Sequence, residues 1–437
     1  MNKKVLFLSI ILTTILLGGC ILNLPVLILA VVSVICFSLL ALKQSDATNL
    51  LFYFSPLSYL LVYKQYSIYI LIVVSYILIV LLKNQNRNPI GILAVFFLMA
   101  YCLIFSNMDV SIKIGQLIYP ILLFTLIFVC QFTERENYKN CITFFLIGFI
   151  ISVVIGFFKE QIPFIQSIFT SDSLYIDGVE TSMNIQRYSG LSYDPNFFAL
   201  IDCTLISLLL FNKTKMGLLK GVSILFLMVV GFFTFSKSYV ILLAIILLAY
   251  VFINSKNPFK NIGIIVGALI CLMLIERFSD IKVISLIEAR FSSAENANDL
   301  TTGRVDLWIN YLDYIFNNFK CFVFGEGFNA LSLGKAVHNT YIDFIYRFGF
   351  VGTCLWLAYF NWSKKFVKRN GGIKTSPNIT ALVFFIGIFF LSAFHFQQLW
   401  CCIFFAMISP YSDGGKLDEV KRDCSNIQCG ENTQKVC

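Results

Sequence analysis

Long apolar runs separated by short polar turns make up most of this chain. The runs do not alternate apolar with polar residues, so they predict helices rather than strands. A helix of about 20 apolar residues can cross a membrane. We predict spans at residues 5–22, 25–42, 49–63, 66–82, 90–106, 115–132, 141–158, 193–211, 217–235, 238–253, 261–276, 338–360, 378–395 and 397–410. Because the third and the last are short, the prediction is about 12–14 transmembrane helices.

Composition supports this class of protein. The chain is 58% apolar and 13% charged, with a mean hydropathy of +0.81, whereas a soluble domain is about half apolar and about a quarter charged. We therefore predict an all-α polytopic membrane protein. The excess of 33 basic over 24 acidic residues is not taken as a sign of nucleic-acid binding, because in membrane proteins the distribution of positive charge matters more than its sum.

The cysteines could indicate disulfides or a metal site, and the N-terminus could indicate a cleaved signal. Most of the 14 cysteines lie in apolar runs or in the last residues, and no CxxC pair occurs, so neither a disulfide scaffold nor a metal site is predicted. The start, MNKKVLFLSIILTTILLGGC, resembles a lipoprotein-type signal. A second apolar run follows it directly, which favours an uncleaved first helix.

Positive charge predicts the orientation of the spans. The short basic segments 212–220 and 363–374 are expected on the cytoplasmic side. Alternating spans then place both long loops outside. The predicted parts are N-terminal helices 1–158, a first periplasmic loop 159–192, central helices 193–276, a second periplasmic loop 277–337, C-terminal helices 338–410 and a cytoplasmic tail 411–437.

The second loop has the pattern of an amphipathic helix from Val305 onward. Thr301 or Thr302 is expected to cap it, and Gly325 and Gly327 follow it. Its apolar residues recur at helical spacing: Trp308, Tyr311, Leu312, Ile315, Phe316 and Phe319. We expect this helix to lie on the outer boundary between membrane and water.

His338 is the first candidate for chemistry, at the outer mouth of the predicted span 338–360. Histidine moves protons near neutral pH; the alternative is an ordinary interfacial residue. Asn339 can cap the helix. Asp343 and Arg347 stand four residues apart inside the span, an arrangement that is costly in lipid unless it faces the protein interior or a wet cavity.

Two glycines of the same span are predicted to have a packing role. Gly349 and Gly352 are three residues apart, so on a continuous helix they fall on one face and allow close approach of a neighbour. Together with the charged pair, they suggest that this helix forms the wall of a site opening outward.

The second candidate is Arg187, just before the span 193–211. Arginine can grip phosphate oxygens in two places, although an interfacial arginine that snorkels is the alternative. Asp194 before Pro195 predicts a helix start. The other loop adds the positive charges of Arg277, Arg290 and Arg304. The two histidines, His338 and His395, are far apart in sequence, and no metal-binding motif or phosphate-cradling Gly-Lys-Ser/Thr motif occurs.

These residues resemble a known family. His338-Asn339, nine residues, Gly349, two residues and Gly352 resemble the H-[NSQ]-x9-G-x-x-G pattern of the O-antigen ligase and O-antigen polymerase superfamily. Over residues 185–410 the order of the other elements is also similar: Arg187-x-x-Gly190, Asp194-Pro195-Asn196, Gly303-Arg304 with Trp308, and Gly325-Glu326-Gly327.

The resemblance implies a multi-pass glycosyltransferase of the bacterial inner membrane, GT-C-like, with its active site facing the periplasm and without metal or cofactor. Its substrates would be oligosaccharides linked to undecaprenyl diphosphate. His338 would be the general base, and Arg187, Arg304 and Arg290 would grip the diphosphate. Asn339, Asp194, Asn196, Asp343, Arg347, Gly349 and Gly352 would support the site. Expected partners are the lipid bilayer, a chain-length regulator and a flippase, but no nucleic acid.

Three functions stay open at this stage. A polymerase moves the glycan onto another lipid-linked repeat unit, and we prefer it because Asp194-Pro195-Asn196 is more similar to polymerases. A ligase moves the glycan onto the lipid A core with the same chemistry. A flippase for the lipid-linked unit would need charges along a path inside the membrane, where this chain has Asp202, Asp343 and Arg347.

Overall fold

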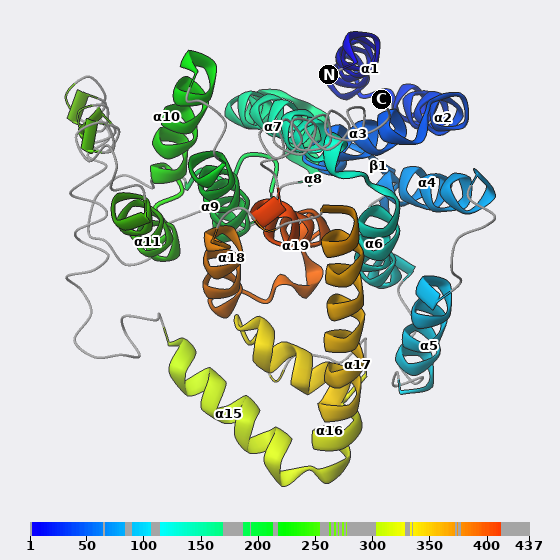
Figure 1. The fold of residues 1–437 in the computed structure, drawn as a ribbon, viewed down its shortest axis with the longest axis vertical. Helices are drawn as coiled ribbons and strands as arrows, with labels where there is room; N and C mark the ends of the chain where they lie inside the picture. The colour runs from blue at the N-terminus through cyan, green and yellow to red at the C-terminus, as the bar shows by residue number, and fades with distance from the viewer. Residues whose placement is uncertain are drawn as a thin grey trace, which may run out of the picture.

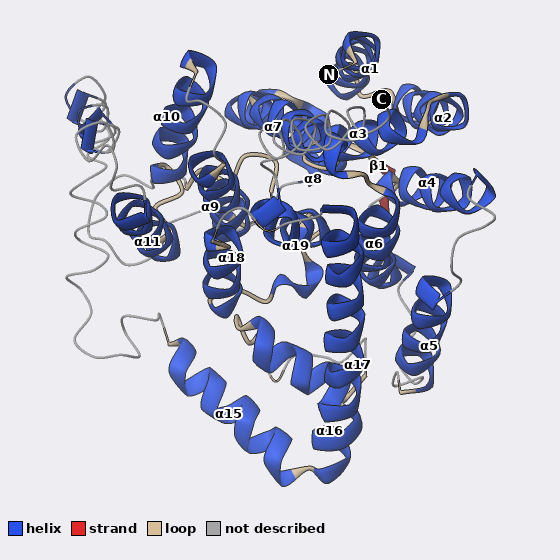
Figure 2. Ribbon diagram, viewed as in Figure 1, coloured by secondary structure: helices blue, strands red, loops and turns tan. Residues whose placement is uncertain are grey.

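Helices account for nearly all of the ordered secondary structure in the computed structural model (Figures 1 and 2). The structure describes residues 2–63, 66–83, 90–105, 114–168, 187–192, 194–212, 217–253, 303–327, 333, 335–371, 374 and 377–411, with isolated residues between 262 and 277. The predicted span 261–276 and the tail 411–437 therefore lie almost wholly outside the described residues, as do large parts of both predicted loops.

The described α-helices follow the apolar runs of the sequence. They are α1 Lys3–Ile21, α2 Pro25–Ala41, α3 Gln44–Phe54, α4 Tyr69–Lys83, α5 Ile90–Ile104, α6 Ile114–Phe132, α7 Arg135–Phe157, α8 Pro163–Ile168, α9 Pro195–Phe211, α10 Leu218–Phe232, α11 Lys237–Ile253, α15 Arg304–Asn317, α16 Phe319–Phe324, α17 Thr340–Gly371, α18 Ile379–Phe389 and α19 Leu399–Ile408. Short 3₁₀ turns are η1 Ser58–Leu60, η2 Lys159–Gln161, η4 Ala393–His395 and η5 Ser409–Tyr411. Two short antiparallel strands, β1 Val62–Tyr63 and β2 Tyr66–Ser67, form a hairpin.

Local sequence signals fix several helix starts. α9 begins at Pro195, and the side chain of Asp194 accepts a hydrogen bond from the backbone N–H of Asn196 at 2.6 Å. A proline at the first position and an acidic cap before it are the expected combination. α16 is capped in the same way by Asn318, whose Oδ1 accepts from the N–H of Cys321 at 3.2 Å.

The main core lies where α3, α6, α7, α9 and α19 meet, with α19 near the middle of the bundle (Figure 1). Its centre is aromatic: the ring of Phe52 lies 5.1 Å from those of Trp400 and Phe404 and 5.4 Å from that of Phe405. Every one of these side chains is fully buried. Close packing of large rings gives these helices a single well-defined arrangement.

Among the described residues, two helices are long and apolar enough to cross a membrane, α1 and α7. Eight further apolar stretches of 10–17 residues are shorter, and they belong to α2, α4, α6, α9, α10, α11, α18 and α19. The peripheral helices leave large apolar side chains exposed, among them Phe37 of α2, Leu82 of α4, Phe96 of α5 and Phe252 of α11.

A second, smaller core lies outside the main bundle. It contains Tyr311, Ile315, Cys321, Val337, Ile342 and Tyr346, and it joins α15, α16 and the first turns of α17. Figure 1 shows α15 at the lower edge of the molecule, where it runs into α16 beside α17. We call α15 and α16 together the α15–α16 unit.

The amphipathic helix predicted in the second loop is present as α15. It buries Tyr311 and Ile315, and it exposes 68% of Phe316. The helix ends at Asn317, so Phe319 belongs to α16 rather than to the same helix, because Asn318 interrupts the run and caps the next one. The predicted caps Thr301 and Thr302 lie outside the described residues, and Gly303, in the left-handed conformation with φ 77°, precedes the first turn.

Several predicted spans have different limits in the structure. The span 338–360 becomes α17, which begins at Thr340, continues to Gly371 and is broken at Gly349. The span 378–395 ends as a helix at Phe389 and continues as the turn 390–398. The break at Gly349 depends on the close approach of residues 323–325, which an apolar run does not encode. The segment after Phe389 does carry polar residues, Ser392, His395, Gln397 and Gln398, but the predicted spans ran through most of it.

Candidate functional site

The candidate site lies where the starts of α9, α15 and α17 meet the turn 390–393. The sequence places these four segments far apart, in both predicted loops and at the end of a predicted span. Each start is fixed by a local signal: Asp194 caps α9, Gly303 precedes α15 and Asn339 caps α17. The turn 390–393, which joins α18 to η4, holds the α15 and α17 starts in place.

Hydrogen bonds hold the backbone at and just before His338. It has φ 49°, which is uncommon for a residue other than glycine. Its N–H donates to Oγ of Ser392 at 2.9 Å. On its N-terminal side, Val337 accepts a 2.9 Å hydrogen bond from Nε1 of Trp308. Strained backbone persists only where the surroundings over-determine it, and here Ser392 and Trp308 provide two such contacts.

Asn339 follows directly and caps α17. Its Oδ1 accepts hydrogen bonds from the N–H groups of Tyr341 at 3.0 Å and Ile342 at 3.2 Å. His338 therefore precedes the helix instead of belonging to it. The imidazole lies near enough to Arg304 at the start of α15 and to Asp194 at the start of α9 for both charges to act on it.

Burial and two charged side chains act on the pKa of His338. Burial lowers the pKa of its imidazole, and the nearby positive charge of Arg304 lowers it further, while Asp194 opposes them. An imidazole with a pKa below its usual 6.5 is neutral at neutral pH. A neutral imidazole can accept a proton, and the carboxylate of Asp194 can then stabilise the imidazolium that forms.

Arg304 is tied to the same turn that holds His338. Its Nη1 donates to the carbonyl of Phe390 at 2.7 Å. The hydroxyl of Thr340, at the start of α17, donates to the carbonyl of Leu391 and accepts from the N–H of Ala393 at 2.9 Å. The turn 390–393 thus connects the first residue of α15 to the first residue of α17.

Arg187 lies on the other side of the site, against the bundle. Its Nε donates to the carbonyl of Thr234 at 3.0 Å and its Nη2 to Oδ1 of Asn196 at 3.4 Å. The Nδ2 group of Asn196 donates to Oδ1 of Asp194 at 2.8 Å, and Ser236 donates to Oδ1 of Asn196 at 2.6 Å. A continuous hydrogen-bonded chain therefore runs from Arg187 to Asp194, beside His338.

The structure brings together most of the predicted site residues. Asp194, Asn196, Arg304, His338 and Asn339 lie at or just before the starts of three helices, and Arg187 is joined to them by its hydrogen bond to Asn196. Arg290 lies outside the described residues, so its role stays a prediction. Within the described ranges, no group of three or more His, Cys, Asp or Glu side chains is placed to hold a metal ion.

Asp343 and Arg347 form the predicted pair within α17. Nε of Arg347 lies 2.7 Å from Oδ1 of Asp343, and both side chains are buried. The guanidinium also lies over the ring of Phe394, 5.9 Å from its centroid. Because Phe394 directly follows the turn 390–393, the pair contacts the segment that holds the starts of α15 and α17.

The prediction that Gly349 and Gly352 share one helix face is wrong. Gly349 has φ 61° and ψ −172°, so the helix is interrupted there. A Cβ on Gly349 would overlap the backbone of residues 323–325, whereas a Cβ on Gly352 would overlap the ring of Tyr101. Each glycine thus allows a different close approach, Gly349 to α16 and Gly352 to α5.

Sequence reasoning missed the turn 390–393 and Tyr101. The hydroxyl of Tyr101 lies 3.0 Å from the carbonyl of Phe324 and 2.7 Å from that of Phe348, so it joins α5 to the end of α16 and to the residue just before the Gly349 break. Ser392 was a weak signal: it is a small polar residue inside the apolar run 378–410. Nothing in the sequence around Tyr101 distinguishes it from other tyrosines in apolar helices.

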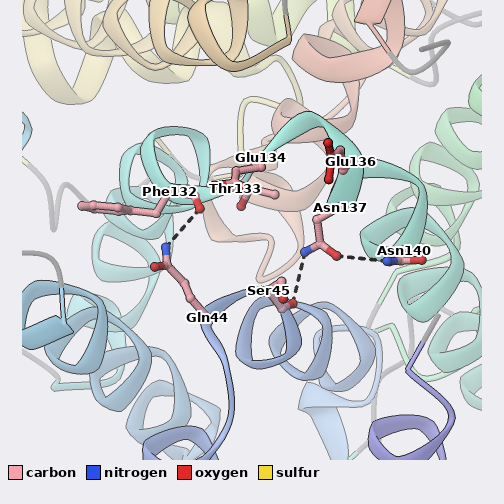
Figure 3. Close-up of a pocket in the computed structure, with 8 residues that line it drawn as sticks. All are labelled: Gln44, Ser45, Phe132, Thr133, Glu134, Glu136, Asn137 and Asn140. Atoms are coloured by element: carbon pink, nitrogen blue, oxygen red, sulfur yellow. Dashed lines mark hydrogen bonds between the residues drawn. The ribbon is translucent and has the colours of Figure 1, made fainter. Parts of the chain in front are cut away.

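A polar cavity of about 510 Å³ lies elsewhere, between the start of α3, the end of α6 and the start of α7 (Figure 3). Asn137 is its central residue and donates to the carbonyl of Ser45 at 3.1 Å. Glu134 and Glu136 are exposed at its rim. None of the predicted site residues lines this cavity.

The chain was compared with known proteins. No protein-family model matches it, and no curated protein matches it. The functional interpretation therefore rests on the residues of this chain and on their geometry.

Proposed function

We propose that this protein is a glycosyltransferase of the bacterial inner membrane that polymerises lipid-linked glycan repeat units at the periplasmic face. The single observation that carries the proposal is the position of His338: a partly buried imidazole with a lowered pKa, between Arg304 and Asp194. A neutral base beside fixed guanidinium groups suits a reaction that takes a proton from an acceptor and releases an anionic leaving group.

The exposed apolar surface supports a multi-pass arrangement. Phe37 is 71% exposed, Leu82 67%, Phe97 70% and Phe252 77%, and these residues lie on four different peripheral helices. A soluble monomer rarely exposes apolar surface on this scale. Lipid around these helices would cover the exposed apolar side chains. We therefore propose a GT-C-like protein with about 12–14 spans and two periplasmic loops.

The chemistry follows from the site. His338 takes the proton of an acceptor sugar hydroxyl, and the acceptor oxygen forms a bond to the anomeric carbon of the donor glycan. The bond between that carbon and the phosphate oxygen breaks, and its electron pair leaves with undecaprenyl diphosphate. Arg304 and Arg187 stabilise the charge that develops on the diphosphate. Asp194 stabilises the imidazolium, and no metal is needed for these steps.

A ligase that transfers the glycan to the lipid A core would use the same base and the same guanidinium groups. The two activities differ in the acceptor, and the glycan products of cells separate them. A strain that lacks a polymerase carries single repeat units on the core, whereas a strain that lacks a ligase has a bare core and polymer that stays on its carrier.

The test combines that deletion strain with a His338→Ala variant. Polymer should be lost in the deletion strain, restored by the wild-type gene and not restored by His338→Ala, because losing a general base costs about 10²–10⁴-fold in rate. Equal amounts of both proteins in the membrane fraction are the control. Near-normal polymer with His338→Ala overturns the role of His338.

The pH dependence gives an independent measurement. Since only the neutral imidazole accepts a proton, kcat/KM of the purified enzyme should fall as the pH drops through the pKa of His338. Burial and Arg304 lower that pKa, so the acid limb should lie below the usual value of about 6.5. An acid limb above that value contradicts the environment described for His338.

A further inference from the structure

Lys159 is a buried cation that the proposed site does not use. It begins η2, just beyond the end of α7, and only 7% of the residue is exposed. Its Nζ donates to Oγ of Ser189 at 3.2 Å, and Ser189 is fully buried. Within the described part of the chain this hydroxyl is the hydrogen-bond acceptor of the ammonium, and no carboxylate pairs with it.

A buried ammonium with one neutral acceptor is an incomplete arrangement. Lysine carries three N–H donors, and a buried charge normally has an anion beside it. Burial lowers the pKa of Lys159, and Glu160, which is exposed, opposes this only in part. An anion bound beside Nζ would supply the missing acceptors.

Lys159 contacts the segment 187–190 through Ser189, two residues after Arg187. That segment rests on the end of α7: Gly190 lies against Gly156, and the ring of Tyr188 stacks on Phe157 at 4.6 Å. Arg187 instead reaches toward α9 and the turn before α11. Lys159 and Arg187 therefore have different hydrogen-bond partners: Ser189 for Lys159, and Thr234 and Asn196 for Arg187.

We propose that Lys159 and Ser189 form a second anion-binding site, which holds the diphosphate of the acceptor substrate. The inference rests on the proposed polymerase function. A polymerase binds two lipid-linked units, and each carries a diphosphate. The reacting hydroxyl of the acceptor is separated from its own diphosphate by the sugars of the repeat unit. The second diphosphate must therefore bind at the same face as the first but apart from His338.

The test counts binding sites on the full chain. Farnesyl diphosphate, a short isoprenyl diphosphate, is titrated into the purified protein in a detergent with an uncharged headgroup. Two equivalents should bind to the wild type and one to Lys159→Met. Lys159→Arg should keep both, because it preserves the charge. Lys320→Met, which removes an exposed lysine of α16, is the matched control and should also keep both.

A second variant tests the site independently, in case Lys159→Met does not fold. Ser189→Ala retains the cation but removes its hydroxyl partner, and it should weaken one of the two sites about tenfold, in line with a hydrogen bond to a charged group. The affinity of that site should also fall as the pH rises through the pKa of Lys159, because only the ammonium binds an anion. Two equal, pH-independent sites in Lys159→Met overturn the proposal.

The same titration separates this inference from the proposed function. If Arg304→Met removes one equivalent and Lys159→Met removes none, the donor site stands and the acceptor site is wrong. If neither variant changes the binding, both are wrong. Phosphatidylglycerol added at the same concentration should displace neither equivalent; displacement of the equivalent that depends on Lys159 alone identifies a phospholipid headgroup and overturns the acceptor assignment.

Discussion

The two sides of His338 are built in different ways. On one side, α9 buries all but two of its residues in the main core, and Asp194, Asn196 and Arg187 are fixed on its start by side-chain hydrogen bonds. On the other side, α15 buries only Tyr311 and Ile315 and belongs to a core of its own. Stability follows buried apolar area, so the α9 side is the rigid half of the site.

The α15–α16 unit is attached to the bundle by a few specific contacts. Glu326 and Gly327 donate their N–H groups to the carbonyls of Tyr346 at 2.8 Å and Arg347 at 3.0 Å. Tyr101 adds its hydroxyl from α5, and Arg304 reaches the turn 390–393. Regions with few buried contacts open at low free energy. We therefore expect the α15–α16 unit to move relative to α9 more readily than the helices of the main core move relative to one another.

The largest expected effect comes from breaking the attachment of the unit. Gly349→Ala places a Cβ against the backbone of residues 323–325 at a residue with φ 61°. Strain and overlap together cost on the order of 3 kcal/mol, so activity should fall about 100-fold. Limited proteolysis should show faster cleavage within 303–327, with the α9 side unchanged.

The matched control for that variant is Gly221→Ala in α10. A Cβ at Gly221 meets no atom within 4 Å, so activity and proteolysis should stay as in the wild type. Wild-type activity for Gly349→Ala would show that the close approach of α16 to α17 does not position the site.

A second prediction compares the two arginines. Arg187→Lys and Arg304→Lys keep the charge but lose the planar fork, and each should reduce kcat about tenfold, the effect of one charged hydrogen bond. Arg304→Met also removes the positive charge that lowers the pKa of His338, so the acid limb of the pH profile should move to higher pH. Asp194→Asn should move it to lower pH, because Asp194 raises that pKa.

These opposite shifts test whether His338 responds to both halves of the site. Shifts of the same sign, or no shift with Arg304→Met in a correctly inserted protein, contradict the arrangement in which α9 and α15 act on His338 from two sides.

The smallest predicted effect concerns Ser392, whose hydroxyl holds the backbone of His338. Ser392→Ala removes the acceptor of the His338 N–H, and a neutral hydrogen bond of about 1 kcal/mol corresponds to about a fivefold change. The loss should appear in kcat rather than in KM, and Ser392→Thr should restore it. An equal loss in both variants points to packing instead of hydrogen bonding.

The sequence by itself determined the helical architecture, because long apolar runs without alternation of apolar and polar residues are typical of helices and not of half-buried strands. It also marked the helix starts at Pro195 and Thr340, since Asp194 and Asn339 cap them locally. It singled out His338, a rare residue at a helix start, as the candidate base.

Only the tertiary structure decided how these local features meet. The left-handed conformation of Gly349 depends on the backbone of α16, and that of His338 on a hydrogen bond to Ser392, 54 residues further along the chain. The environment of His338 depends on Arg304 and Asp194, which come from different helix starts. Local pattern encodes propensity and capping, but a close approach or an electrostatic field arises only when distant segments pack together.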